Sequence, residues 1–335
     1  MAEMMKGNIA IAEAAVRAGV RLYAGYPITP SSEIMEYLSW RLPEVGGAFV
    51  QAESELAGIN MVYGGSSCGV RVLTASSGPG ISLKQEGISV LSDEELPALV
   101  INVVRYGNGL GTLFSSQCDY LRETRGGGNG DYRCIVLCPS SIQEAVDMVS
   151  TAYELGEKYR VVVVMMTEGA LGQMMEPVEF NYVPRPNLPE KTWALVGHYG
   201  AERSNIKNLV IEPDECEAWN HDHFKVYDEV VKNEQAWEEY KMDDAEYAFV
   251  SYGTASRVVR TAIGYLRAEG YKVGMIRPKT LWPFPQKAFD KFNDKIKKFL
   301  DVEMSMGQMV PDVAYACNDR NKVAFHGRTG GNVPT

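Results

Sequence analysis

The stretch Gly-Tyr-Pro-Ile-Thr-Pro-Ser-Ser-Glu, from Gly25 to Glu33, joins a short apolar run to an amphipathic segment. Pro27 disfavours the helical conformation at Tyr26, and Pro30 suits the first position of a helix that Thr29 would cap. Apolar residues at helical spacing follow: Ile34, Met35, Leu38 and Leu42. A polar turn between a strand end and a helix start is where open α/β sheets bind anionic ligands. A well-capped helix without a ligand would explain the stretch equally well.

Strand-like runs alternate with helix-like segments on both sides of this stretch. Strands are expected at 20–24, 48–50, 70–74, 97–104, 135–137 and 161–166. Helices are expected at 8–18, from 30 onward, 54–63, 80–91 and 140–155. The run 97–104 is almost continuously apolar, which is typical of a parallel strand covered on both faces. The alternation predicts a doubly wound α/β domain with a parallel sheet over residues 1–180.

The pattern changes twice in the second half of the chain. Residues 181–244 are rich in proline and then strongly polar, which predicts a linker or an extended arm. After residue 245 the alternation returns, with strands expected at 247–252, 271–276 and 323–325 and a helix at 255–269. The sequence therefore predicts a second, smaller α/β domain over residues 245–335.

Charge and hydropathy limit the classes of function. The 335 residues include 33 Lys and Arg against 43 Asp and Glu, a formal net charge of -10, which argues against a basic surface for nucleic acid or anionic lipid. No apolar stretch approaches the ~20 residues that span a bilayer, and the N-terminus has no signal-like pattern. A cytoplasmic protein without membrane contact is expected.

The cysteines and histidines do not form a metal-binding pattern. Six cysteines are scattered along the chain without a Cys-x-x-Cys pair: Cys68, Cys118, Cys134, Cys138, Cys216 and Cys317. His221 and His223 flank Asp222 but lack further ligands nearby. The chain is expected to hold no metal and no iron–sulfur cluster of its own.

Polar groups follow several of the predicted strands, at one edge of the predicted sheet. Glu53 and Glu55 lie at the start of a helix, where interaction with the helix dipole is the simpler explanation. The turn 76–80, Ser-Ser-Gly-Pro-Gly, matches neither a P-loop nor Gly-x-Gly-x-x-Gly, which disfavours a nicotinamide-linked dehydrogenase. Arg105 follows the next strand and could clamp a carboxylate or form a surface ion pair. A Gly-rich loop over 105–133 is long enough to suggest function, so together the turns favour a ligand site.

Several motifs resemble those of the α subunit of the 2-oxoacid:ferredoxin oxidoreductases. They are Tyr26 to Glu33, Ala52 to Glu55, Thr74 to Gly80, Asp119 to Tyr132, Pro139 to Glu144 and Gly169 to Pro177. In the second domain, Ile276 to Pro285 resembles the transketolase C-terminal-like domain of the same family. The resemblance covers the chain apart from about 181–244.

The resemblance implies a fold and a reaction. The first domain would be the pyrimidine-side thiamine diphosphate domain, and the second the transketolase C-terminal-like domain. Family members use thiamine diphosphate to decarboxylate a 2-oxoacid, pass electrons to ferredoxin through iron–sulfur clusters and transfer the acyl group to coenzyme A.

The resemblance also implies roles for individual residues. Glu55 would hydrogen-bond the aminopyrimidine ring and favour the imino tautomer that generates the ylid. Thr29 would contact the substrate or its adduct with the cofactor, and Arg105 would hold the substrate carboxylate. The remaining cofactor-binding residues would be Tyr26, Pro27, Ser77 and Gly78.

The missing motifs indicate a divided enzyme. The segment Gly130-Asp131-Tyr132 does not complete the Gly-Asp-Gly and Asn pattern by which thiamine enzymes commonly hold magnesium and diphosphate. By the resemblance, Mg²⁺ and the [4Fe–4S] clusters would lie on partner subunits. The expected assembly is a hetero-oligomer with β, γ and ferredoxin-like δ subunits, and with ferredoxin as electron acceptor.

The substrate depends on the loop 106–119. This loop resembles the branched-chain, 2-oxoisovalerate group of the family, and it lacks an added Arg or Lys for a second carboxylate. Leu110, Leu113 and Phe114 could wall an apolar pocket, so a branched-chain or other apolar 2-oxoacid is expected. The alternatives are a 2-oxoglutarate enzyme and, in a different class, a non-catalytic α/β scaffold subunit.

Overall fold

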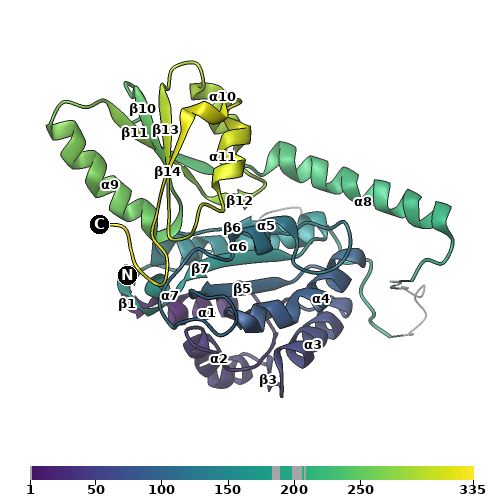
Figure 1. The fold of residues 1–335 in the computed structure, drawn as a ribbon. Coiled ribbons are helices and arrows are strands. Elements are labelled where there is room, and N and C mark those ends of the chain that lie inside the picture. The colour runs from purple at the N-terminus through teal and green to yellow at the C-terminus, as the bar shows by residue number, and fades with distance from the viewer. Residues whose placement is uncertain (1, 183–188, 198–205, 207–208) are drawn as a thin grey trace.

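The computed structural model describes residues 2–182, 189–197, 206 and 209–335. Two sheets with helices around them make up most of the molecule, and one long helix projects beyond them (Figure 1). The α/β class with a parallel, doubly wound first sheet is confirmed.

The first sheet has seven strands in the order β12-β6-β7-β5-β4-β2-β3. Six come from the first half of the chain and pair in parallel: β2 (Leu22–Gly25), β3 (Ala48–Gln51), β4 (Val72–Ser76), β5 (Leu99–Val104), β6 (Ile135–Leu137) and β7 (Val163–Glu168). Strand β12 (Thr280–Trp282) comes from the C-terminal part and pairs antiparallel with β6. Every residue of β4, β5 and β7 is buried, as the apolar run at 97–104 predicts.

Helices cover both faces of this sheet. They are α1 (Gly7–Arg17), α2 (Ser32–Glu44), α3 (Glu55–Ser67), α4 (Pro79–Asp93), α5 (Tyr120–Arg125), α6 (Ile142–Tyr159) and α7 (Gly169–Gln173). One apolar core joins α1, α2 and α6, and a second joins α3 and α4 to the C-terminal part of the chain. A short antiparallel pair, β1 (Glu3–Lys6) with β8 (Met175–Val178), lies outside the sheet.

Side-chain caps fix where two of these helices begin. Ser54 accepts a hydrogen bond from the Ala57 amide, and Ser141 accepts one from the Glu144 amide. The prediction that Thr29 caps the next helix is wrong, because α2 begins at Ser32 with Ser31 as its N-cap residue. The Thr29–Pro30 peptide is cis, so the chain turns before the helix starts.

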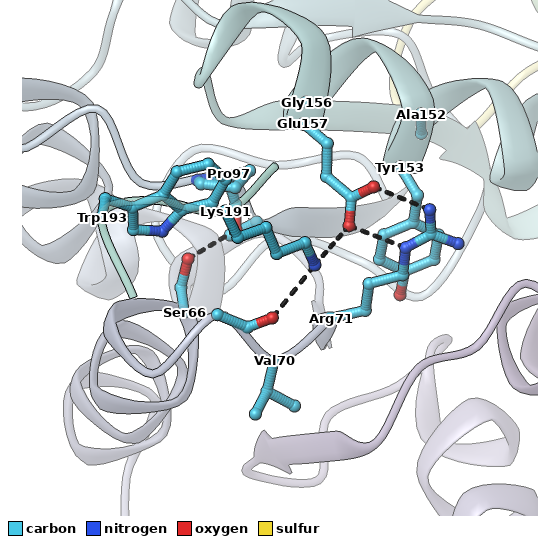
Figure 2. Close-up of a pocket in the computed structure, with 12 residues that line it drawn as sticks. Ser66, Val70, Arg71, Pro97, Ala152, Tyr153, Gly156, Glu157, Lys191 and Trp193 are labelled. Carbon is cyan, nitrogen blue, oxygen red and sulfur yellow. Dashed lines mark hydrogen bonds and ion pairs between the residues drawn. The ribbon is translucent and has the colours of Figure 1, made fainter. Parts of the chain in front are cut away.

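Residues 189–197 contact helix α6 and the turn before β4 through Lys191 (Figure 2). Glu157 of α6 accepts two hydrogen bonds from Arg71, at 2.8 and 2.7 Å, and pairs with Lys191 at 2.6 Å. The Lys191 ammonium also donates to the Gly69 carbonyl. The cavity beside these groups is about 10 Å³, close to the least that holds one water. These contacts fasten the segment and leave no room for a ligand.

The segment 181–244 contains more regular structure than the sequence predicts. Its described part includes α8 (Pro213–Asn233), most of which is exposed, and β9 (Trp237–Tyr240), which joins the second sheet. Only His223, Tyr227 and Val230 of α8 are buried. In Figure 1 the helix extends away from both sheets.

The second sheet has five strands in the order β14-β13-β10-β11-β9. With β9 it contains β10 (Tyr247–Val250), β11 (Val273–Pro278), β13 (Lys298–Glu303) and β14 (Val323–Gly327). All pairs are parallel except that of β9 with β11. Its helices are α9 (Gly253–Ala268), α10 (Gln286–Phe292) and α11 (Val310–Ala316), with a 3₁₀ turn at Arg320–Lys322. The predicted elements at 247–252, 255–269, 271–276 and 323–325 are confirmed, whereas β12, β13, α10 and α11 were not predicted.

A buried ion pair joins strand β11 of the second sheet to helix α6, which packs on the first sheet. Arg277 of β11 donates to both carboxylate oxygens of Glu144, at 2.7 and 2.9 Å, and to Glu238 at 2.8 Å. The exposed fractions of the Arg277 and Glu144 side chains are 3% and 15%. Burial alone would raise the pKa of Glu144, but the hydrogen bonds and charge of Arg277 lower it to about 2.

We expect Arg277→Met to lower the free energy of unfolding by about 3 kcal/mol near pH 7, because it removes both hydrogen bonds of the guanidinium to buried Glu144 and leaves that carboxylate only Lys279, at 3.1 Å, as a cation. Since the pKa of Glu144 is depressed, the ion pair contributes its full stability above about pH 4.5 and loses it as the pH falls towards 2. Denaturant unfolding between pH 3 and 7 should show a smaller acid-induced loss in the variant. Arg257→Met, which removes a half-exposed pair with Glu176, is the matched control and should cost less than about 1 kcal/mol.

Candidate functional site

The predicted site residues meet where β2, β4 and β5 end. The turn after β2 contains Tyr26, Pro27 and Thr29, and all three side chains are exposed. The turn after β4 contains Ser77 and Gly78, and Arg105 directly follows β5. Parallel strands place their carboxyl ends on one edge of a sheet, so residues from 26 to 105 share a single edge.

Glu55 is the first residue of α3, and 7% of its surface is exposed. Its carboxylate lies against the first turn of α4, because a Cβ atom on Gly80 would come within 2.5 Å of Glu55 Oε1. The neighbouring Glu53 is exposed. The structure thus separates the two carboxylates of the motif into one at the surface and one within the site.

The turn between β4 and α4 brings unpaired hydroxyl groups into the site. Gly78 has a φ of +48°, a conformation that L side chains rarely adopt. The hydroxyls of Ser76 and Ser77 are buried and have no hydrogen-bond partner within the described part of the chain. Buried polar groups are usually paired, so these two hydroxyls are suited to a ligand that the polypeptide does not supply.

Arg105 lies on the other side of Gly78. One terminal nitrogen donates to the Thr29 carbonyl at 2.8 Å and the other to the Leu110 carbonyl at 3.0 Å. Its Nε has no partner among the residues that the structure describes, and a Cβ atom on Gly78 would come 3.2 Å from it. Only 5% of Arg105 is exposed, and no carboxylate of the described chain pairs with it. A buried cation of this kind is suited to an anionic ligand.

The loop 106–119 covers this edge. Leu110, Leu113 and Phe114 are 80%, 61% and 67% exposed, so within this chain they do not form a closed pocket. The end of the loop is anchored by buried Gln117, whose amide donates to Glu168 at 2.7 Å and to the Tyr252 carbonyl at 2.9 Å. The loop is therefore fixed at one end, and its apolar side chains remain available for contacts.

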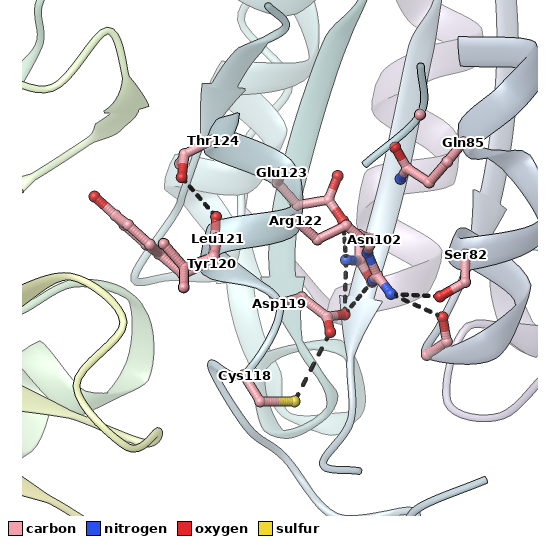
Figure 3. A network of polar contacts seen from close by, with 12 residues as sticks. Ser82, Gln85, Asn102, Cys118, Asp119, Tyr120, Leu121, Arg122, Glu123 and Thr124 are labelled. Atoms are coloured by element: carbon pink, nitrogen blue, oxygen red, sulfur yellow. Dashed lines mark hydrogen bonds and ion pairs between the residues drawn. The ribbon is translucent and has the colours of Figure 1, made fainter. Parts of the chain in front are cut away.

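A polar network that the sequence did not reveal supports the Gly78 turn (Figure 3). Arg122 contacts Asp119 at 2.5 Å, Glu123 at 3.1 Å and the Gly78 carbonyl at 3.2 Å. Asn102 donates to both carboxylates, at 3.0 and 2.9 Å. Asp119, Arg122 and Glu123 are neighbours in sequence, whereas Asn102 is 17 residues from Asp119 and Gly78 is 44 residues from Arg122. The sequence carried no signal for these two long-range contacts.

Lys84 is the second group that sequence reasoning missed. It lies on α4 at 0% exposure, and its Nζ is 3.3 Å from the Glu55 carbonyl oxygen. The burial of Lys84 could have been predicted from the sequence, because it lies three residues after Ile81 and four before Ile88, on the same face of the helix, and both isoleucines are buried.

The described residues offer neither a metal-binding cluster nor a membrane-spanning helix. They contain no group of three or more His, Cys, Asp or Glu side chains that could hold a metal ion. Among the helices of the described ranges, none is both long enough and apolar enough to cross a membrane.

Two family models together match most of the chain. The thiamine diphosphate-binding model of pyruvate flavodoxin/ferredoxin oxidoreductase matches residues 13–239. Core domain II of pyruvate:ferredoxin oxidoreductase matches residues 245–335.

Curated relatives match over nearly their full length. The ketoisovalerate oxidoreductase subunit VorB of Methanothermobacter thermautotrophicus is 47% identical, covering 99% of this chain and 94% of its own. The 2-oxoglutarate synthase subunit KorA of Methanocaldococcus jannaschii is 36% identical, covering 99% and 96%.

Solved structures agree with the fold. A 2-oxoglutarate:ferredoxin oxidoreductase from Magnetococcus marinus, with 2-oxoglutarate, coenzyme A and succinyl-CoA bound, superposes with a TM-score of 0.87 at 27% identity. All of this chain is matched, and it spans 63% of that solved chain. A split-gene transketolase in an inactive β4 tetramer, at 12% identity and a TM-score of 0.58, shares the fold. The chain therefore belongs to the pyruvate flavodoxin/ferredoxin oxidoreductase family, as a subunit of a 2-oxoacid:ferredoxin oxidoreductase.

Proposed function

We propose that this chain is the α subunit of the enzyme and supplies the pyrimidine-side half of a thiamine diphosphate site. The enzyme would oxidatively decarboxylate an apolar 2-oxoacid, transfer the acyl group to coenzyme A and reduce ferredoxin. The observation that carries the proposal is the placement of a buried carboxylate, Glu55, and a buried cation, Arg105, on either side of the 78–80 turn.

The residues present fit the pyrimidine half of the cofactor. Glu55 offers a carboxylate to a ring nitrogen, and the unpaired hydroxyls of Ser76 and Ser77 offer further hydrogen bonds. Gly78 would let the ligand approach the backbone, and exposed Tyr26 and Pro27 would border it. When bound, thiamine diphosphate supplies the nucleophilic carbon and the electron sink for loss of carbon dioxide.

Each catalytic residue would have a distinct task. Glu55 would hold and return a proton at the aminopyrimidine, as a general acid and base. Arg105 would orient the substrate carboxylate through its Nε and terminal nitrogens, and the Thr29 side chain would contact the substrate beside it. The carbonyl contacts of Arg105 with Thr29 and Leu110 would hold the guanidinium in place for this purpose.

The remaining parts of the enzyme would come from other chains. We assign Mg²⁺, the diphosphate site and the [4Fe–4S] clusters to partner subunits, namely β, γ and a ferredoxin-like δ, in a cytoplasmic hetero-oligomer. Residues 1–180 would form the pyrimidine-side domain, 181–244 the linker or arm and 245–335 the transketolase C-terminal-like domain. Copurification of the full chain with its partners, followed by iron analysis of each subunit, tests this assignment.

We expect 2-oxoisovalerate to be preferred over 2-oxoglutarate by about tenfold or more in kcat/KM. VorB relatives are named for ketoisovalerate, and the exposed Leu110, Leu113 and Phe114 provide apolar surface in a loop, 106–119, whose sequence contains no Arg or Lys for a second carboxylate. The measurement compares 2-oxoisovalerate, an aryl 2-oxoacid and 2-oxoglutarate in the assembled enzyme. A preference for 2-oxoglutarate would favour the KorA-like alternative and require a basic residue elsewhere.

A further inference from the structure

Lys84 is a buried cation that the proposed function leaves without a role. It lies on α4 one turn after Gly80, the residue against which the Glu55 carboxylate packs. The described chain gives its ammonium group one hydrogen bond, to the Glu55 backbone carbonyl at 3.3 Å. A fully buried ammonium group with one hydrogen bond is costly, so its retention beside Glu55 calls for a reason.

We propose that Lys84 is a positioning residue for Glu55: its hydrogen bond to the Glu55 carbonyl holds the first turn of α3 in place and keeps the Glu55 carboxylate in position against Gly80. This inference rests on the proposed role of Glu55 as the acid and base of the site. Lys84 is fully buried and bonds to the Glu55 backbone, so it acts through Glu55 and does not itself touch the substrate.

The charges around Lys84 support this assignment. Glu55 of α3 is the charged group that acts on it electrostatically, and its attraction favours the protonated lysine. The other cations near α4, Arg105 beside Gly78 and Arg122 on the Gly78 carbonyl and Ser82, lie at its first turn. Glu94 lies at the opposite end of the helix. Glu55 is therefore the carboxylate that compensates the charge of Lys84 between α3 and α4.

The pair makes stability depend on pH in a particular direction. Burial lowers the pKa of Lys84 from 10.5 to about 8, and the charge of Glu55 opposes that shift. Between pH 8 and 10.5 the folded chain has lost this proton while the unfolded chain still binds it, so stability should rise with pH. The folding constant should gain roughly 100-fold across this range relative to a chain without the lysine.

The first test compares the wild-type enzyme with Lys84→Met, whose side chain has similar length and no charge. Denaturant midpoints of the assembled enzyme are measured from pH 7 to 10.5. We expect the denaturant midpoint of the wild-type enzyme to rise relative to that of Lys84→Met as the pH increases from 8 to 10.5. A difference between the two midpoints that does not change with pH would overturn the proposal.

The second test does not require the Lys84 variant to fold. Glu55→Gln removes the negative charge that raises the pKa of Lys84, so the rise in stability should begin at a lower pH. Glu86→Gln is the matched control, because it removes one negative charge from an exposed position on the same helix. It should not change the pH at which the rise in stability begins. A rise that Glu55→Gln does not move would contradict the coupling.

Activity separates a failure of this inference from a failure of the proposed function. In Lys84→Met we expect kcat of the assembled enzyme to fall about 10- to 100-fold while KM for the 2-oxoacid changes by less than about threefold, because a displaced carboxylate impairs proton transfer more than substrate binding. If Glu55→Gln is inactive but Lys84→Met keeps the wild-type kcat, the positioning role is wrong and the proposed function stands. If Glu55→Gln is fully active, the proposed function fails, whereas the stability tests still decide the coupling.

Discussion

Glu55→Gln is expected to reduce turnover of the assembled enzyme by about 100- to 10,000-fold while the fold is retained. The amide has the size of the carboxylate and can occupy the same space against Gly80, but it cannot accept and return a proton. The expected loss is mainly in kcat, measured with saturating thiamine diphosphate and 2-oxoacid. Unfolding midpoints near pH 7 show whether the fold is retained.

Glu53→Gln is the matched control for this prediction. It removes a carboxylate two residues away in the same motif, but Glu53 is exposed and lies outside the site. Its kcat should change by less than about threefold, because an exposed carboxylate away from the site takes no part in proton transfer. Equal losses from the two substitutions would mean that the motif acts as a structural unit and that neither carboxylate is the acid and base.

The sequence predicted six of the seven strands of the first sheet because each of these six is signalled locally, whereas β12 joins from the C-terminal part of the chain and was not predicted. Continuous apolar runs such as 97–104 occur where both faces are covered, and Ser54 and Ser141 mark helix starts through their own hydrogen bonds. The prediction for Thr29 was wrong because a turn closed by the hydrogen bond from the Ser31 amide to the Ile28 carbonyl precedes α2, so the helix begins at Ser32. The helix over 213–233 was missed because its apolar face is narrow and most of its surface is exposed.

The candidate site could be predicted only in outline. The carboxyl ends of parallel strands share one edge, so Thr29, Ser77 and Arg105 could be placed together from their positions after strands. Lys84 required knowing that α3 packs on α4, and the Arg122 network required the return of the loop to the Gly78 turn. Contacts of this kind depend on tertiary packing, which the spacing of residues along the chain does not encode.

Arg105 should be sensitive even to substitution by lysine, because its planar group makes two fixed contacts and still has an Nε–H without a partner in the described chain. The terminal nitrogens are held by the Thr29 and Leu110 carbonyls, and the unpaired Nε faces Gly78. A lysine ammonium is a point charge on a flexible stem and cannot keep both carbonyl contacts while presenting a donor to a carboxylate. The substitution keeps the charge and changes the geometry, so it separates orientation from simple attraction.

We therefore expect Arg105→Lys to lower kcat/KM of the assembled enzyme roughly 30- to 1,000-fold, which corresponds to a loss of about 2 to 4 kcal/mol of transition-state stabilisation. Both parameters should change, since the contact orients the substrate carboxylate before and during its loss. Arg125→Lys, at the half-exposed last residue of α5, which pairs with Asp312, is the control and should have little effect. A rise in KM with unchanged kcat would limit Arg105 to binding, and no change in either parameter would show that another cation holds the substrate carboxylate.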